Sequence, residues 1–257
     1  MRQLQLIEKV RQQSLQNEDI SAVLMYGSFT KGEGDQYSDI EFYIYYRTKE
    51  CPDKLGLISQ IAPVLLFFTN EFGTDVAVFE NMIRGEFHFH PVSDIEDIRA
   101  WPKVISFEFK DKMNLMDKDG TLSAVLDSIP PIRPERYTSE NREYLACNLI
   151  NNLIFENNLI LRGEYAHAHQ LFGFIQRYIL WLMRLYLKKD NHWEAPPTKK
   201  LEEDIPPHEW YLKYEQCIPT LDKESLQESF KSAVELTDFL FSGLDIPENI
   251  HTILRRL

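Results

Sequence analysis

The sequence predicts an α+β protein, in which a front half that contains a β-sheet is followed by a bundle of helices. Two observations carry this prediction. Short apolar runs with the length of strands recur through the first ninety residues, whereas the apolar residues after about residue 140 recur with the helical period of 3.6. Between the two regions, Ser128–Pro134 holds three prolines in seven residues, which excludes a helix or a central strand. An α/β arrangement of the front half remains open at this point.

The front half begins with a loose helical face over residues 4–16. The run 22–26 is short and apolar and ends at Gly27, as a buried strand does. Residues 27–38 are rich in Gly, Ser and charge, which favours a loop with one helical turn. Further strands are expected over 40–46, 62–68, 74–79 and around Phe87 and Phe89.

The second half is predicted to be helical over residues 140–161, 164–189 and 222–241. Gly163 stands between the first two as a C-cap or turn, and residues 190–207 form a polar loop that contains prolines. We therefore expect two domains, over residues 1–128 and 129–257.

The composition excludes several classes of protein. The 257 residues include 28 Lys and Arg against 40 Asp and Glu, so the net charge is −12. A surface this negative disfavours nucleic acid as a partner, and any phosphate that the protein handles should arrive with a cation. The longest purely apolar run, Tyr178–Met183, is too short to span a bilayer, so we expect no membrane partner. Three scattered cysteines favour free thiols in a reducing cytoplasm.

One segment combines the residues needed for chemistry on a nucleotide. Asp39 and Glu41 are two apart on an expected strand, so both carboxylates project from the face opposite Ile40. Two carboxylates this close suit Mg²⁺, which prefers a few carboxylates together with substrate phosphate oxygens. Gly27 and Ser28 directly follow a strand, where exposed N–H groups and a hydroxyl can form a nest for an anion. The alternative is a hairpin whose acidic outer face is simply solvated.

This segment resembles the nucleotidyltransferase signature of the DNA polymerase β-like superfamily, in which Gly-Ser and Asp-x-Asp/Glu flank a turn. The longer stretch is most similar to the lincosamide nucleotidyltransferases of the two-domain kind. The matching segments are Tyr26–Phe42, Glu71–Thr74, Ile83–Phe89, Arg162–Ala166 and Leu221–Lys223. The resemblance implies a nucleotidyltransferase domain with a mixed sheet and flanking helices, followed by a helical domain that selects the acceptor.

The resemblance also implies a catalytic role for a third carboxylate. Glu86 matches the family's general base, which sometimes contacts the metal, and strand alternation places it with His88 and His90, opposite Phe87 and Phe89. We favour Glu86, with Asp75 as the competing candidate.

The remaining site residues follow from the same likeness. Gly27 and Ser28 would hold the β- and γ-phosphates of ATP, and Lys31 lies in the same loop as a further phosphate contact or a solvated lysine. Asp39, Glu41 and Glu86 would hold Mg²⁺, two ions in the family's pattern. Two roles are open for Arg84: its side chain neutralises charge on the triphosphate, or it pairs with a surface acid.

The expected function is therefore magnesium-dependent transfer of AMP from ATP to a hydroxyl of a lincosamide such as lincomycin or clindamycin, with release of pyrophosphate. Two alternatives remain at this point: the same transfer to an aminoglycoside, and a non-catalytic, nucleotide-binding regulatory protein with the same fold. A homodimer also agrees with the resemblance, because relatives often dimerise.

Overall fold

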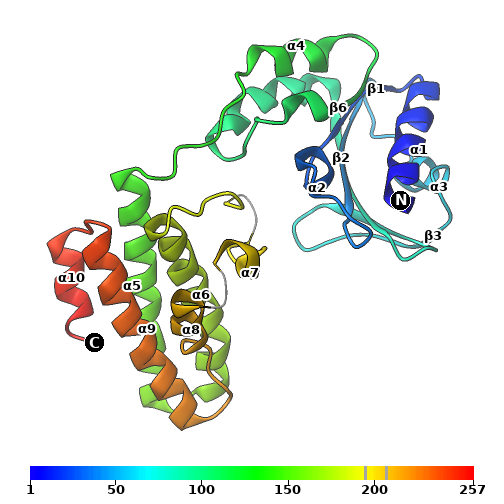
Figure 1. Ribbon diagram of the computed structural model, residues 1–257. Helices are drawn as coiled ribbons and strands as arrows, with labels where there is room; N and C mark the ends of the chain where they lie inside the picture. The colour runs from blue at the N-terminus through cyan, green and yellow to red at the C-terminus, as the bar shows by residue number, and fades with distance from the viewer. Residues whose placement is uncertain (194–195, 206–207) are drawn as a thin grey trace. The chain divides into compact units, whose positions relative to one another are not determined.

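The computed structural model describes residues 1–193, 196–205 and 208–257 and divides into two compact units, Met1–Pro134 and Glu135–Leu257 (Figure 1). The first unit contains a six-stranded sheet and the second is helical, which confirms the α+β prediction with a helical second part. None of the helices within the described residues is long and apolar enough to cross a membrane.

The sheet of the first unit is mixed. Its strands are β1 Ile20–Met25, β2 Ile40–Tyr46, β3 Val64–Thr69, β4 Asp75–Phe79, β5 Arg84–Pro91 and β6 Asn114–Asp117. They lie in the order β3-β4-β5-β2-β1-β6. Only β2 and β5 pair in parallel; the other four pairs in the sheet are antiparallel. The parallel pair brings β2 and β5, which are far apart in the sequence, together at the centre of the sheet.

Each face of this sheet is covered by its own hydrophobic core. On one face, α1 (Arg2–Gln16) and α3 (Lys54–Ser59) pack against the side chains of Phe42 and Phe87. On the other face, the 3₁₀ helix η1 (Val92–Lys103) and α4 (Thr121–Ser128) pack against Tyr45. The short elements α2 (Ser28–Lys31) and η2 (Lys110–Lys112) complete the unit. Strand alternation therefore gives the central strands β2 and β5 two faces with different neighbours.

The first unit extends past the predicted boundary between residues 128 and 129. Ile129 is buried in the core beneath α4, and the N–H of Phe107 donates to the carbonyl of Ile132 at 2.8 Å. Arg133 also pairs with Glu108 of the first unit. These contacts keep the proline-rich segment against the sheet domain until Pro134, although it contains neither helix nor strand.

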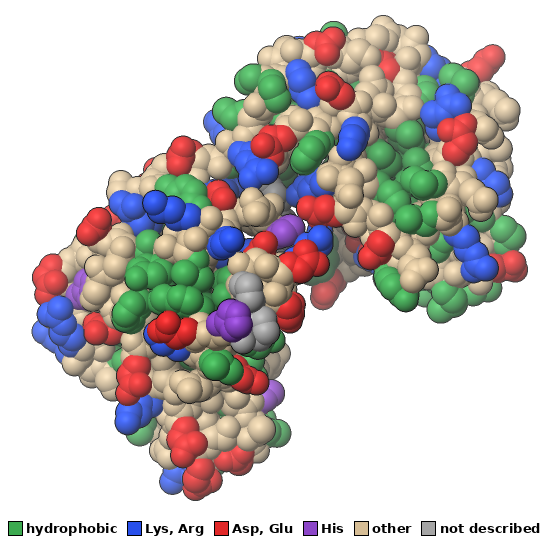
Figure 2. Space-filling model, in the orientation of Figure 1, with side chains coloured by type: hydrophobic (Ala, Val, Ile, Leu, Met, Phe, Trp, Pro, Cys, Tyr) green, Lys and Arg blue, Asp and Glu red, His purple; other side chains and the backbone are tan. Residues whose placement is uncertain are grey.

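The second unit is built on a hairpin of two long helices. Its helices are α5 Ser139–Arg162, α6 Tyr165–Tyr186, α7 Leu201–Asp204, α8 Glu209–Glu215, α9 Lys223–Gly243 and α10 Glu248–Leu254. Thr138 caps α5 by accepting from the N–H of Asn141 at 3.1 Å, and Gly163 ends it in the left-handed conformation with φ 76°. The apolar faces of α5, α6 and α9 meet in one core. On the face drawn in Figure 2, acidic and basic side chains are interspersed over both units, so the negative charge does not gather into one patch there.

Candidate active site

Two of the three carboxylates predicted to hold the metal lie opposite each other on neighbouring strands. Glu41 of β2 and Glu86 of β5 are register partners in the parallel pair, so both project from the same face of the sheet. Asp39 immediately precedes β2. This face is the one that η1 and α4 cover further along the strands, whereas Ile40 and Phe87 enter the core of the opposite face. The alternation predicted for β2 and β5 is thus confirmed.

Gly27 forms the boundary between β1 and α2, and its backbone approaches Glu41 closely. Its φ is 79°, in the region that L side chains rarely adopt, and a Cβ at this position would overlap the carboxylate of Glu41. Ser28 is the first residue of the four-residue helix α2, and Lys31 is its last. The Gly-Ser turn and the carboxylate of Glu41 therefore adjoin, while Lys31 lies one turn further along α2.

Arg84 supplies a cation to this group of acids. It is the first residue of β5, and its guanidinium donates from Nη1 to Oδ2 of Asp39 and from Nη2 to Oε1 of Glu86. The side chain of Arg84 is 38% exposed and that of Glu86 is 21% exposed, so the pair is partly withdrawn from water. Of the two roles that the sequence leaves open for Arg84, the structure favours pairing with acids, and these acids are two of the predicted metal ligands.

A tyrosine and a histidine support the other side of Glu86. Tyr26, the last residue before Gly27, donates from its hydroxyl to Oε2 of Glu86 at 3.2 Å, and the same hydroxyl lies 2.9 Å from Nε2 of His88. The ring of His88 stacks on Tyr43 with the centroids 4.3 Å apart. Burial lowers the pKa of His88, and burial together with the charge of Glu86 raises the pKa of Tyr26. Both groups are therefore neutral near pH 7, and Tyr26 remains a hydrogen-bond donor to the carboxylate.

The sequence does not predict the contact between Tyr26 and Glu86. The signal available is the position of Tyr26, directly before the Gly-Ser turn at the end of an apolar strand. Its partner is sixty residues away in the sequence and reaches it only because β5 lies beside β2, which itself pairs with β1.

Asp75, the competitor for the role of general base, lies on the opposite face of the sheet. It is the register partner of Phe87, and its carboxylate is bound by Lys54 at 2.6 Å and by the hydroxyl of Thr69 at 2.8 Å. Only 4% of Asp75 is exposed. These contacts make Asp75 part of the packing beneath α3 and separate it from Glu41 and Glu86.

The chemistry of the donors suits a hard divalent cation. Asp39, Glu41 and Glu86 offer carboxylate oxygens, the ligands that Mg²⁺ prefers, and the guanidinium of Arg84 already occupies a cation position between two of them. In their present rotamers, no three His, Cys, Asp or Glu side chains in the part of the chain that the structure describes form a metal-ligand set.

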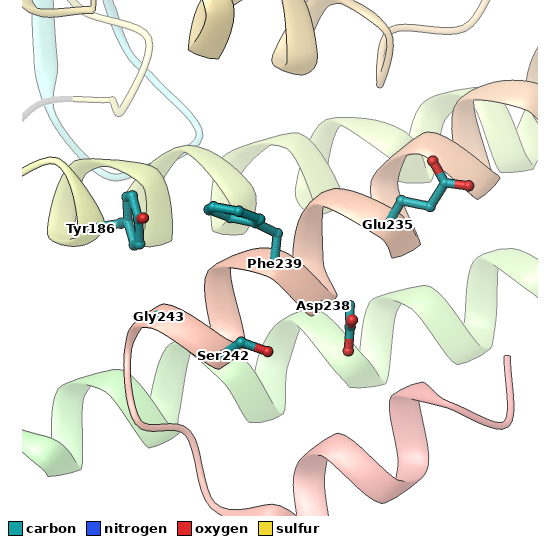
Figure 3. Close-up of a pocket in the computed structure, with 6 residues that line it drawn as sticks. All are labelled: Tyr186, Glu235, Asp238, Phe239, Ser242 and Gly243. Carbon is teal, nitrogen blue, oxygen red and sulfur yellow. The ribbon is translucent and has the colours of Figure 1, made fainter.

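The second unit carries a separate depression of about 630 Å³ on its surface (Figure 3). Tyr186 of α6 lines it together with five residues of α9, which are Glu235, Asp238, Phe239, Ser242 and Gly243. The rings of Tyr186 and Phe239 lie 5.6 Å apart and form its apolar wall. The sequence predicts no substrate-binding residue in this unit, because helical periodicity does not separate a lining residue from a surface residue.

Comparison with known families identifies the helical unit. Residues 138–256, from the cap of α5 to α10, match the model of the lincosamide nucleotidyltransferase-like C-terminal domain. The helical unit is therefore similar to the C-terminal domain of this family. For the helical unit, this match confirms the resemblance found in the sequence. No match was found among curated proteins.

Two solved structures resemble the chain only distantly. An aminoglycoside 6-adenyltransferase from Bacillus subtilis aligns over 98% of this chain and 96% of its own, with 13% identity and a TM-score of 0.43. A nucleotidyltransferase-like protein from Exiguobacterium sibiricum aligns over 88% and 72%, with 14% identity and a TM-score of 0.41. At these scores neither likeness bears on the activity or the substrate of this chain.

Proposed function

We propose that the chain transfers AMP from ATP to a hydroxyl of a lincosamide antibiotic and releases pyrophosphate. The observation that carries the proposal is the pairing of Glu41 with Glu86, next to Asp39 and to the Gly-Ser turn, on one face of the sheet. The match of residues 138–256 to the lincosamide nucleotidyltransferase-like C-terminal domain supports the choice of acceptor.

Each residue of the group has a part in this reaction. The backbone at Gly27 and the hydroxyl of Ser28 would bind the β- and γ-phosphates, with Lys31 as a further contact, so that pyrophosphate is oriented as the leaving group. Asp39, Glu41 and Glu86 would hold Mg²⁺, which neutralises the charge that develops on the phosphate oxygens.

Glu86 would act as the general base. The acceptor oxygen forms a bond to the α-phosphorus while the bond from that phosphorus to the pyrophosphate oxygen breaks, and the acceptor proton passes to a carboxylate oxygen of Glu86. The hydrogen bond from Tyr26 to Oε2 leaves Oε1 as the oxygen that accepts this proton, once Arg84 has released it.

The proposal is tested by incubating the full chain with MgATP and lincomycin or clindamycin and analysing the products by mass spectrometry. A mass increase of one AMP on the drug, together with stoichiometric pyrophosphate, is the expected result. Kanamycin serves as the second acceptor, and modification of kanamycin alone would move the substrate to the aminoglycosides. ATP binding without transfer to either drug would contradict the enzymatic proposal.

A variant of the general base tests the mechanism in the same assay. Glu86→Gln should reduce turnover by about 10²-fold or more, because the amide cannot take the acceptor proton. Asp75→Asn is the matched control, since Asp75 lies on the opposite face of the sheet. Wild-type turnover of Glu86→Gln would exclude Glu86 as the base.

A further inference from the structure

Arg84 binds two of the three carboxylates proposed to hold the metal and joins two strands through them. Its guanidinium uses one terminal nitrogen for Asp39, directly before β2, and the other for Glu86 on its own strand. We propose that Arg84 is a resident counter-ion, which holds Asp39 and Glu86 in place while no metal is bound and which a divalent cation must displace. This inference rests on the proposed function, because it assigns the same carboxylates to the metal.

The need for a counter-ion follows from the placement of the acids. Glu41 and Glu86 are direct register partners, and Asp39 adjoins them, so three negative groups share one edge of the parallel pair. Like charges opposite each other on neighbouring strands destabilise a sheet. Arg84 brings one permanent positive charge to this group and donates hydrogen bonds to Glu86 and Asp39.

The form of the side chain matters as much as its charge. A guanidinium is planar and presents its N–H groups as a fork, so a single Arg can bind two carboxylates at once, whereas a Lys ammonium acts as a compact point charge. Arg84 therefore ties the loop before β2 to β5 at the position where a divalent cation would gather the same oxygens. The two cations compete for Asp39 and Glu86, and metal binding must free the guanidinium beside the site.

Binding of Mn²⁺ to the nucleotide-free full chain tests this competition without a measurement of activity. Free Mn²⁺ is followed by electron paramagnetic resonance during a titration of the wild type and of Arg84→Gln. Removing one unit charge at contact distance from a partly exposed site should tighten Mn²⁺ binding by at least about fivefold. Arg99→Gln is the matched control, because Arg99 belongs to the same unit and pairs with Glu96 at 2.6 Å, among surface side chains. We expect this control to bind Mn²⁺ as the wild type does.

Thermal unfolding gives a second readout on the same proteins. Without divalent ions, Arg84→Gln should melt at a lower temperature than the wild type. Mn²⁺ should raise the melting temperature of Arg84→Gln by more than it raises that of the wild type. Arg84→Lys keeps the charge but loses the fork, so its affinity for Mn²⁺ should lie between the two. It also provides the comparison if Arg84→Gln does not fold without metal.

The outcomes separate this inference from the proposed function. Equal or weaker Mn²⁺ binding by Arg84→Gln and Arg84→Lys than by the wild type would overturn the counter-ion role. Weaker binding by Asp39→Asn in the same titration would then show that the metal assignment itself survives. If Asp39→Asn binds Mn²⁺ as tightly as the wild type, the metal assignment fails and the counter-ion role fails with it.

Discussion

Glu156 makes the stability of the helical unit depend on pH. It lies in the middle of α5, none of its surface is exposed, and its neighbours along the buried side of the helix include Leu153 and Leu159. Neither carboxyl oxygen has a hydrogen-bond partner within residues 1–193, 196–205 and 208–257. Burial of the charged form raises the pKa of Glu156 from 4.5 to about 8. The folded protein therefore keeps this carboxyl protonated at neutral pH.

The sign and size of the effect follow from proton linkage. Between pH 4.5 and about 8 the folded state binds a proton at Glu156 that the unfolded chain has released, so the free energy of unfolding falls as the pH rises. Each pH unit in this interval costs about 1.4 kcal/mol, and the whole interval costs about 5 kcal/mol as an upper bound. Below pH 4.5 and above about 8 this contribution no longer changes. A loss of this size is a large part of the roughly 5–15 kcal/mol that stabilises a typical domain.

Glu156→Gln removes the titrating group and nearly keeps the side-chain shape. The assay is urea unfolding of the full chain at pH 5 and at pH 8.5, followed by the fluorescence of the tryptophans, three of which lie in the helical unit at positions 181, 193 and 210. From pH 5 to pH 8.5, the free energy of unfolding of the wild type should fall by about 3 kcal/mol or more beyond any fall in the variant. The other titrating groups are common to both proteins, so this difference reports Glu156.

Glu143→Gln is the control for this experiment, since Glu143 lies on the same helix and is exposed. The reasoning would be refuted if Glu156→Gln and the wild type lost stability in parallel between pH 5 and pH 8.5. If Glu143→Gln differed from the wild type as much as Glu156→Gln does, burial of Glu156 would not be the cause.

Three further predictions concern the sheet domain. Asp39→Asn should weaken the binding of MgATP measured by calorimetry, and unchanged affinity would contradict its role as a metal ligand. Gly27→Ala places a Cβ at a positive φ and against the carboxylate of Glu41. It should cost about 1–2 kcal/mol of stability for the backbone alone and reduce turnover as Glu41 moves, which urea unfolding and the transfer assay measure separately. Asp75→Ala removes a buried carboxylate that binds the partly exposed Lys54 and the hydroxyl of Thr69, and should lower the free energy of unfolding by about 1–3 kcal/mol. The turnover of the folded fraction should stay near that of the wild type, and a selective loss of turnover would return Asp75 to the list of candidate bases.

Local patterns predict much of the fold because they reflect local geometry. β2 begins and ends where the aromatic and isoleucine-rich run does, and α5 ends at Gly163 as its C-cap predicts. Several elements were not expected. β6 has only four residues and no clear alternation, and η1 contains Pro102, so neither shows a period that distinguishes it from a loop. α4 ends where the proline-rich segment begins, and the sequence indicates the linker there but no helix before it.

The sequence by itself determined which face each acid occupies. Alternation along a strand is fixed by the backbone. The order of residues alone therefore puts Glu41 on the other face of the sheet from Ile40, and Glu86 on the other face from Phe87. The Gly-Ser turn next to a buried strand is local in the same sense.

The tertiary structure alone decided which acids meet. Strand pairing is a long-range contact, and only the order of strands in the sheet puts β5 in parallel beside β2 and so brings Glu86 opposite Glu41. The same pairing gives Arg84 its two partners and Tyr26 its contact with Glu86, and it leaves Asp75 on the far face with Lys54. The periodicity of a strand specifies a face but carries no information about the neighbouring strand, because that choice depends on the burial and hydrogen bonding of the whole sheet.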